Sequence, residues 1–401
     1  NANIEFLQRG IILIKKEIAY IRKQFKLDHE RLSIYDILNV YIMKETNEIY
    51  HFERTPFELL EREKQELHMG NFKRLLSGEL DQKLFEVKFQ EHPETDKPAQ
   101  ELLHQALVTG DADEWHDLML LLVEKMLEDT TYERDTVITF VRGQYYKPTK
   151  ERNEEAEESE TDEMFANPFI LCSINSTEPQ RKTLMFDYVE REFKNNVIVD
   201  PIIKLRSPEQ GFFYPSITDG FSDVNRVLYC AGKANDPNQH FIDQVLNAEK
   251  TVTALEERAI FEEIVKEVAG DQLDASTIAS VYEEIQQVIE THEEEEPPKL
   301  DYRDVERVLT ASGVENVTTE KVELAYQTVI DDKNYEIKAS SVVPKFTSKS
   351  IKIETKVATI SVSPQDLKYL KQVNYHGKRC ILIEVDEDAV IEGFTLSTEE
   401  L

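Results

Sequence analysis

The first apolar pattern along the chain is helical. Apolar side chains recur at three- and four-residue spacing through Ile11, Ile14, Ile18, Ile21 and Phe25. This spacing places them in one stripe along a helix. We therefore expect an amphipathic first helix that packs onto the rest of the protein through that stripe.

Runs rich in β-branched and aromatic residues then predict strands. Residues 40–43 and 49–52 flank a polar turn and predict a hairpin, while residues 135–146 and 168–174 predict two neighbouring strands. Residues 182–193 are a third strand candidate in the same region. Because consecutive strands usually lie side by side, an antiparallel sheet is the simplest topology.

The remaining patterns are mainly helical up to about residue 330. Thr55 and Pro56 have the capping and first-turn preferences that begin a helix, and residues 56–132 are expected to be mostly helical. Further helices are predicted over residues 239–247, 252–269, 275–292, 300–312 and 318–330. Beyond them the pattern alternates, and residues 372–396 predict two strands on either side of Asp386–Asp388.

These elements predict an α+β protein. We expect a mixed N-terminal domain with an antiparallel sheet over residues 1–247, a helical segment over 248–296, and a smaller C-terminal unit of helices and a β-hairpin over 297–401. The domain break is placed at Glu293–Pro298, where glutamates repel one another and two prolines stop a helix.

A second acidic stretch lies within the predicted sheet. Residues 151–163 contain eight carboxylates and one arginine. Predicted strands flank them, so we expect the tip of a hairpin loop over 147–166. A solvated loop is the first interpretation, a segment that binds a partner the second, and a mimic of nucleic acid the third.

Composition narrows the class of protein. The 401 residues are 40% hydrophobic and 31% charged, with a formal net charge of −32. This is apolar enough for a folded core. The charge opposes binding to anionic membranes and phosphate backbones, although it is compatible with a local basic patch. No apolar run approaches the roughly 20 residues of a membrane span, so we expect a cytoplasmic protein.

The sequence contains no motif that is typical of a particular enzymatic reaction. It contains no glycine-rich phosphate loop, no histidine pair or cysteine knuckle at metal-ligand spacing, and no Gly-x-Ser-x-Gly elbow. Cys172, Cys230 and Cys380 lie far apart and are expected to be buried, reduced thiols. We therefore predict no cofactor and no metal, and we favour a non-enzymatic protein.

One segment combines polar groups with aromatic side chains, as small-molecule pockets do. The pattern predicts a turn at Asp219–Gly220, followed by a short helix that Ser222 or Asp223 caps and that ends at Tyr229. A turn, a helix cap and core packing would explain the same residues without a ligand. The candidate pocket residues are Phe213, Tyr214, Asp219, Asp223, Arg226 and Tyr229.

The first helix is the most basic segment of this acidic chain. Five cations within twelve residues could contact the phosphates of a nucleic acid. A solvated flank paired with nearby acids would explain the same pattern. The candidate nucleic-acid contacts are Lys15, Lys16, Arg22, Lys23 and Lys26.

Several segments resemble an uncharacterised bacterial family, domain of unknown function 4317. They are "EIAYIRKQFKLDHERLSIYDI", "FILCSIN", "GFFYPSITDGFSDVNRVLYC", "HFIDQVLNAEKTVTALEERAIFEEIVKE" and "CILIEVDEDAVIEGFTL". The resemblance spans nearly the whole chain in the same order, and it implies no activity. A fainter resemblance is to the bacterial nucleoid-associated protein family. "VITFVRGQYY" with "PFILCSIN" resembles that family's consecutive strands, "HFIDQVLNAEKTVTALEERAIFEEIVKEV" its helix pair, and "CILIEVDEDAVIEGFTL" its closing strands.

Three functions follow as expectations. The first is a cytoplasmic, non-enzymatic binding protein linked to DNA or the nucleoid, with phosphate contacts from the first helix. The second is a ligand-binding protein or enzyme that uses the segment Asp219–Tyr229. The third is an acidic protein that binds a basic protein partner. The sequence leaves the oligomeric state open.

Overall fold

The structure of the protein is a computed structural model. It describes residues 16–128, 130–148, 164–178, 182–197, 200–218, 221–270, 273–292, 298–344, 350–391 and 394–395. Its contacts divide the chain between Thr253 and Ala254 into two compact units. We call Ile12–Thr253 the N-terminal unit and Ala254–Leu401 the C-terminal unit.

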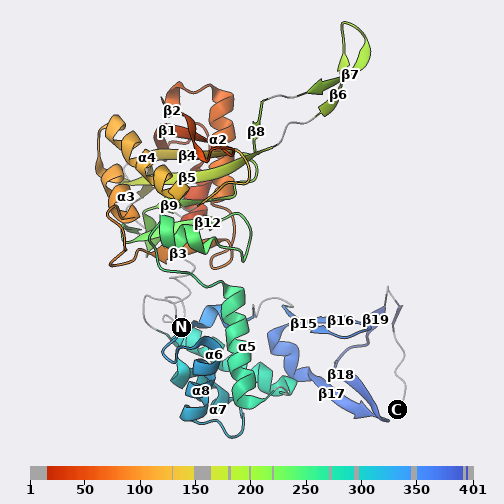
Figure 1. Ribbon diagram of the computed structural model, residues 1–401. Helices are drawn as coiled ribbons and strands as arrows, with labels where there is room; N and C mark the ends of the chain where they lie inside the picture. Colours follow the sequence, from red (N-terminus) through yellow and green to blue (C-terminus); the bar gives the residue numbers. More distant parts are fainter. Residues whose placement is uncertain are drawn as a thin grey trace. The chain divides into compact units, whose positions relative to one another are not determined.

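An antiparallel sheet organises the N-terminal unit (Figure 1). Its strands run in the order β2-β1-β4-β5-β9-β12-β3, and β8 pairs with the end of β5. The expected α+β class with an antiparallel sheet is thereby confirmed. The strands are β1 (Leu32–Met43), β2 (Glu48–Pro56), β3 (Leu84–Lys88), β4 (Thr136–Pro148), β5 (Met164–Glu178), β8 (Ile202–Ile203), β9 (Gln210–Tyr214) and β12 (Arg226–Ala231).

Helices cover both faces of this sheet, so its central strands are apolar on both sides. The helical residues 16–24 and α2 (Arg62–Leu75) contribute to the core on one face. The other face packs against α3 (Ala99–Val108), α4 (Ala112–Glu128) and the π-helical turn η2 (Phe241–Val245). Neighbouring residues of a strand point to opposite faces. Phe213 therefore enters the first core, while Phe212 and Tyr214 enter the second.

Two hairpins of the sheet, β1–β2 and β4–β5, agree with the sequence predictions. β1 pairs with β2, and β4 pairs with β5 over the whole length of β4, from Thr136 opposite Ser176 to Pro148 opposite Met164. The acidic residues 149–163 thus connect two antiparallel neighbours, although they lie outside the described residues. The predicted strand over 182–193 is instead a separate hairpin of β6 (Lys182–Asp187) and β7 (Glu192–Val197).

Two predictions for the N-terminal unit were wrong. β3 lies within the stretch expected to be helical, and only the short 3₁₀ turn η1 (Phe57–Leu59) follows Pro56 before α2 begins. The expected short helix ending at Tyr229 is strand β12, preceded by the hairpin β10 (Ser216–Thr218) and β11 (Phe221–Asp223). Burial of β12 on both sides removes the alternation that would have revealed a strand.

The C-terminal unit has its own helical core. Its first helices α5 (Ala254–Ala269) and α6 (Ala275–Thr291) share this core with the helices that follow residue 300. The division between units consequently lies before α5, and not at Glu293–Pro298. The remaining elements of this core are α7 (Tyr302–Ala311), α8 (Thr319–Ile330), α9 (Ala339–Val342), β13 (Lys299–Leu300) and β14 (Ile337–Lys338).

The end of the chain forms short hairpins. β15 (Ile351–Glu354) pairs with β16 (Thr359–Val362), and after the 3₁₀ turn η3 (Pro364–Tyr369), β17 (Leu370–Tyr375) pairs with β18 (Lys378–Ile383). The turn between β17 and β18 lies at His376 and Gly377, both in the left-handed region. Asp386–Asp388 therefore follow this hairpin and do not form its turn. The last pair is β19 (Val390–Ile391) with β20 (Phe394–Thr395).

His68 gives the N-terminal unit a specific pH response. It lies in α2 and stacks on Phe72 with ring centroids 6.0 Å apart. Burial lowers the pKa of His68 from its usual 6.5 to about 4. Between these values the unfolded chain takes up a proton that the folded protein resists, so stability is complete above pH 6.5 and declines towards pH 4.

We expect His68→Gln to remove this component. Relative to the wild type, the variant should gain up to about 3 kcal/mol in unfolding free energy between pH 7 and pH 4. Urea unfolding followed by fluorescence measures it, because the single tryptophan, Trp115, lies buried in the N-terminal unit. His92→Gln, at an exposed position, is the control. A constant difference between wild type and His68→Gln at all pH values would contradict the prediction.

Candidate nucleic-acid interface

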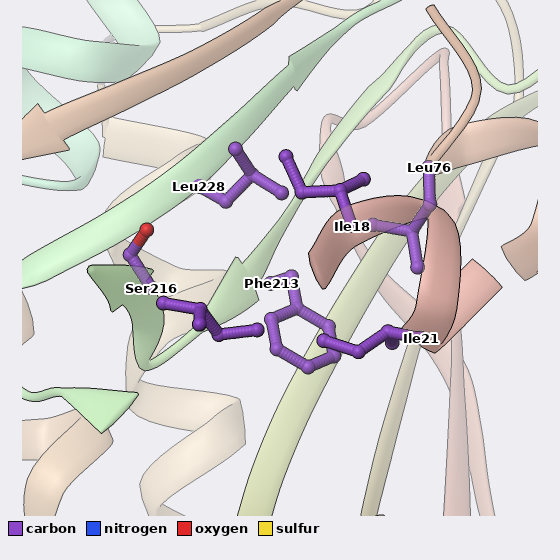
Figure 2. A pocket seen from close by; sticks show the side chains of 7 residues that line it. Ile18, Ile21, Leu76, Phe213, Ser216 and Leu228 are labelled. Atoms are coloured by element: carbon purple, nitrogen blue, oxygen red, sulfur yellow. The ribbon is translucent and has the colours of Figure 1, made fainter. Parts of the chain in front are cut away.

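The predicted apolar stripe fixes the orientation of the first helix. Ile18, Ile21 and Phe25 are buried in the core beneath it, as the spacing predicted. Figure 2 shows Ile18 and Ile21 beside Phe213 and Leu228, which come from strands of the sheet. The helix therefore packs on the sheet through the predicted face, and its other face is turned away from the core.

Two polar contacts also fasten this helix to β4. The Tyr20 hydroxyl donates a hydrogen bond of 2.7 Å to the backbone carbonyl of Tyr146. Lys147 forms an ion pair with the carboxylate of Glu17, which is buried. A buried carboxylate requires such a partner. These contacts hold the helix against rotation and keep the same side chains on its outer face.

The outer face of the helix is cationic. Lys16 and Lys23 are exposed and lie seven residues, or about two turns, apart, which places them on the same side. Lys26 is exposed just after the helix, and Arg22 is half-buried between them. We call Lys16, Arg22, Lys23 and Lys26 the basic face. Lys15, the fifth predicted contact, lies outside the described residues.

The cations of the basic face are not neutralised within the part of the chain that the structure describes. None of the four has a carboxylate oxygen within 4.0 Å there. The start of α2 shows the opposite arrangement: Arg62 pairs with Asp28 at 2.7 Å and Lys64 with Glu61 at 3.7 Å. The basic face thus presents positive charge to the solvent, whereas Arg62 and Lys64 at the start of α2 are paired with acids.

The aromatic residues of the predicted ligand pocket do not come together. Phe213 stacks on Phe169 at 5.2 Å on one face of the sheet, whereas Tyr214 and Tyr229 are buried on the other. The cavity beside Phe213, shown in Figure 2, has a volume of about 10 Å³. This is about the space of a single water. Phe213, Tyr214 and Tyr229 are therefore core residues.

The polar members of that predicted pocket lie at the end of the sheet. Asp223 accepts a hydrogen bond from the backbone N–H of Asn225 in the turn before β12, and it pairs with Arg226 at 3.4 Å. Arg226 also lies 3.8 Å from Glu86. Asp223 and Arg226 line an open depression of about 410 Å³. Asp219 lies outside the described residues.

The whole-chain comparison identifies a family. The sequence pattern of the family described as Domain of unknown function (DUF4317) matches residues 13–394. The chain belongs to this family. Nearly the entire length is covered, which agrees with the resemblance found in the sequence, whereas the comparisons do not show the resemblance to nucleoid-associated proteins. Among proteins with curated functions, none matches this chain.

Two of the three cysteine thiols of this DUF4317 protein lie in its core. Cys172 and Cys230 are buried, and Cys380 is half-buried. Burial raises the pKa of both buried thiols, that of Cys230 to about 12. Within the described ranges, no three histidine, cysteine or acidic side chains gather where they could hold a metal ion. In the same ranges, no helix has the length and apolar content to cross a bilayer.

Sequence reasoning missed the residues that orient the basic face. Tyr20 and Glu17 reach partners more than 120 residues away along the chain. The sequence around Tyr20 and Glu17 contains no pattern that predicts contacts over such a separation. It also missed how exposed the apolar side chains between Leu184 and Phe193 are, because a strand prediction does not say what covers the strand.

Proposed function

We propose that this protein is a binding protein whose basic face contacts the phosphate backbone of DNA. The observation that carries the proposal is the set of unneutralised cations on the outer side of a firmly held helix. Phosphate contacts from lysine and arginine position a protein on DNA without reading its sequence. The expected binding is therefore independent of base sequence.

The net charge of −32 does not prevent this contact at ordinary salt. Charges in solvent are largely screened beyond about 8 Å at physiological ionic strength. A phosphate beside the basic face then responds mainly to the cations nearest to it. The remaining acids weaken the approach of DNA most at low ionic strength, where screening extends over longer distances.

Salt dependence tests the proposal. Each neutralised phosphate lowers the logarithm of the binding constant by about 0.9 per decade of salt, so four contacts predict a slope near −3.6. Fluorescence anisotropy of a labelled duplex measures it with the full chain between 50 and 200 mM salt. We expect affinity to fall by about a hundredfold over this range. Absence of binding, or binding that does not change with salt, would reject the proposal.

The alternative partner gives a different result in the same assay. An acidic protein that binds a basic protein partner would leave the duplex free at every salt concentration. Its complex with a basic protein would also weaken with salt, but replacing lysines of the basic face by glutamate would not weaken it. The two functions are therefore separable with one set of variants.

A further inference from the structure

The hairpin of β6 and β7, which we call the arm (Lys182–Val197), is independent of the basic face. The chain leaves the main sheet after β5 and returns to it at β8, which pairs with the end of β5. Figure 1 shows the arm as a separate hairpin, which stands between β5 and β8 in chain order. It pairs with no other strand among the described residues.

The arm has one apolar side and one charged side. Directly paired residues lie on the same side, and Phe186 pairs with Phe193 with ring centroids 5.1 Å apart. Leu184 follows on this side, and Tyr188 packs edge-on against Phe186 at 5.3 Å. The opposite side carries the ion pair of Asp187 and Lys194. We call Leu184, Phe186, Tyr188 and Phe193 the apolar face of the arm.

This apolar face is open to solvent. Leu184 is 70% exposed, Phe193 72% and Tyr188 86%, with Val189 at the tip 91% exposed. Contiguous exposed apolar side chains mark interaction sites in proteins. An isolated two-stranded hairpin is also only marginally stable in water, and it needs further strands or a packed face. The arm is therefore built to be covered by another surface.

The net charge of the arm indicates which kind of partner surface can cover its apolar face. Lys182, Arg191 and Lys194 balance Asp187, Glu190 and Glu192, so the arm is neutral in a chain of net charge −32. A basic partner would find no excess of acids on the arm, and an anionic membrane would find no excess of cations. A second arm is equally neutral and equally apolar. Two copies of the chain can approach there without the repulsion that their acidic surfaces would cause elsewhere.

The apolar area that two arms could bury against each other is large enough for a specific interface. Aromatic side chains bury roughly 150–250 Å² each, so the exposed parts of the apolar face and Val189 amount to on the order of 600 Å². Two arms face to face would bury on the order of 1,200 Å², above the roughly 1,000 Å² that a specific interface requires. We propose that the protein forms a two-fold dimer in which the apolar faces of two arms cover each other.

Sedimentation of the full chain tests the dimer without any nucleic acid. We expect twice the monomer mass of 46.6 kDa in a concentration series. Leu184→Ser with Phe193→Ser should raise the dissociation constant by about a hundredfold or more, because aromatic anchors dominate interfaces. The matched control is Leu324→Ser with Phe394→Ser, at positions that are 65% and 77% exposed, and it should leave the dimer intact.

A second variant avoids the strands of the arm. Tyr188→Glu lies in the turn between β6 and β7, so pairing within the arm is preserved while a charge enters the proposed interface. This variant should also be monomeric. A wild-type chain that is monomeric throughout, or a dimer that tolerates both arm variants, would overturn the proposal. A monomer that binds neutral lipid vesicles through the arm would overturn it as well and assign the arm to a lipid surface.

Discussion

Glutamate in place of Lys16, Lys23 and Lys26 is expected to abolish binding to duplex DNA. The change turns three exposed cations of the basic face into anions and leaves the buried stripe of the helix untouched. Loss of three phosphate contacts, with repulsion in their place, should weaken binding by at least about a hundredfold at 100 mM salt. Fluorescence anisotropy with the same labelled duplex measures the loss.

A matched variant separates the local effect from net charge. Lys321, Lys356 and Lys378 are exposed lysines of the C-terminal unit. Their replacement by glutamate changes the net charge by the same amount. We expect this variant to bind DNA within about threefold of the wild type, because distant charges are screened. An equal loss in both variants would show that net charge, and not the basic face, governs binding.

Gly211→Ala is expected to destabilise the N-terminal unit severely. Gly211 lies in β9, between β5 and β12. A β-carbon there would come within 2.1 Å of the backbone oxygen of Cys172 and 2.9 Å of a methyl group of Leu75. The backbone of Cys172 cannot move aside for the new β-carbon as the end of a flexible side chain could. We expect a loss of about 3 kcal/mol or more in unfolding free energy, at or beyond the upper range of overpacking.

The single tryptophan makes this loss measurable. Urea unfolding followed by Trp115 fluorescence reports on the unit that contains Gly211. Gly110→Ala is the control, because a β-carbon there meets no atom within 4 Å. It should change stability by no more than about 0.5 kcal/mol. A loss in Gly211→Ala as small as in the control would contradict the described packing of β5, β9 and β12.

The sequence predicted helices and strands correctly where the pattern of apolar residues matched the burial of the side chains. The stripe through Ile18, Ile21 and Phe25 predicted both the first helix and its buried side, and β4 and β5 followed from β-branched and aromatic runs. β12 was misassigned because it is buried on both faces, so its side chains do not alternate. β3 was missed because a five-residue strand within a mostly helical region has little pattern of its own.

The candidate sites show the same contrast. The prediction for the first helix named five cations together and did not separate the exposed Lys16 and Lys23 from the half-buried Arg22. Lys16 and Lys23 share one side of the helix because seven residues make about two turns. Phe213 and Tyr214, two residues of the predicted ligand pocket, are neighbours in a strand and therefore point to opposite faces of the sheet. The predicted helix ended at Tyr229. Strand β12 instead buries Tyr229 on the same face of the sheet as Tyr214, away from Phe213.

Lysine footprinting tests the basic face most directly. The full chain is acetylated with and without excess duplex DNA, and mass spectrometry reads each lysine. We expect DNA to protect Lys16, Lys23 and Lys26, while the exposed Lys321, Lys356 and Lys378 react equally in both samples. Unchanged reactivity at the first three lysines under conditions where DNA is bound, or protection confined to other lysines, would contradict the account.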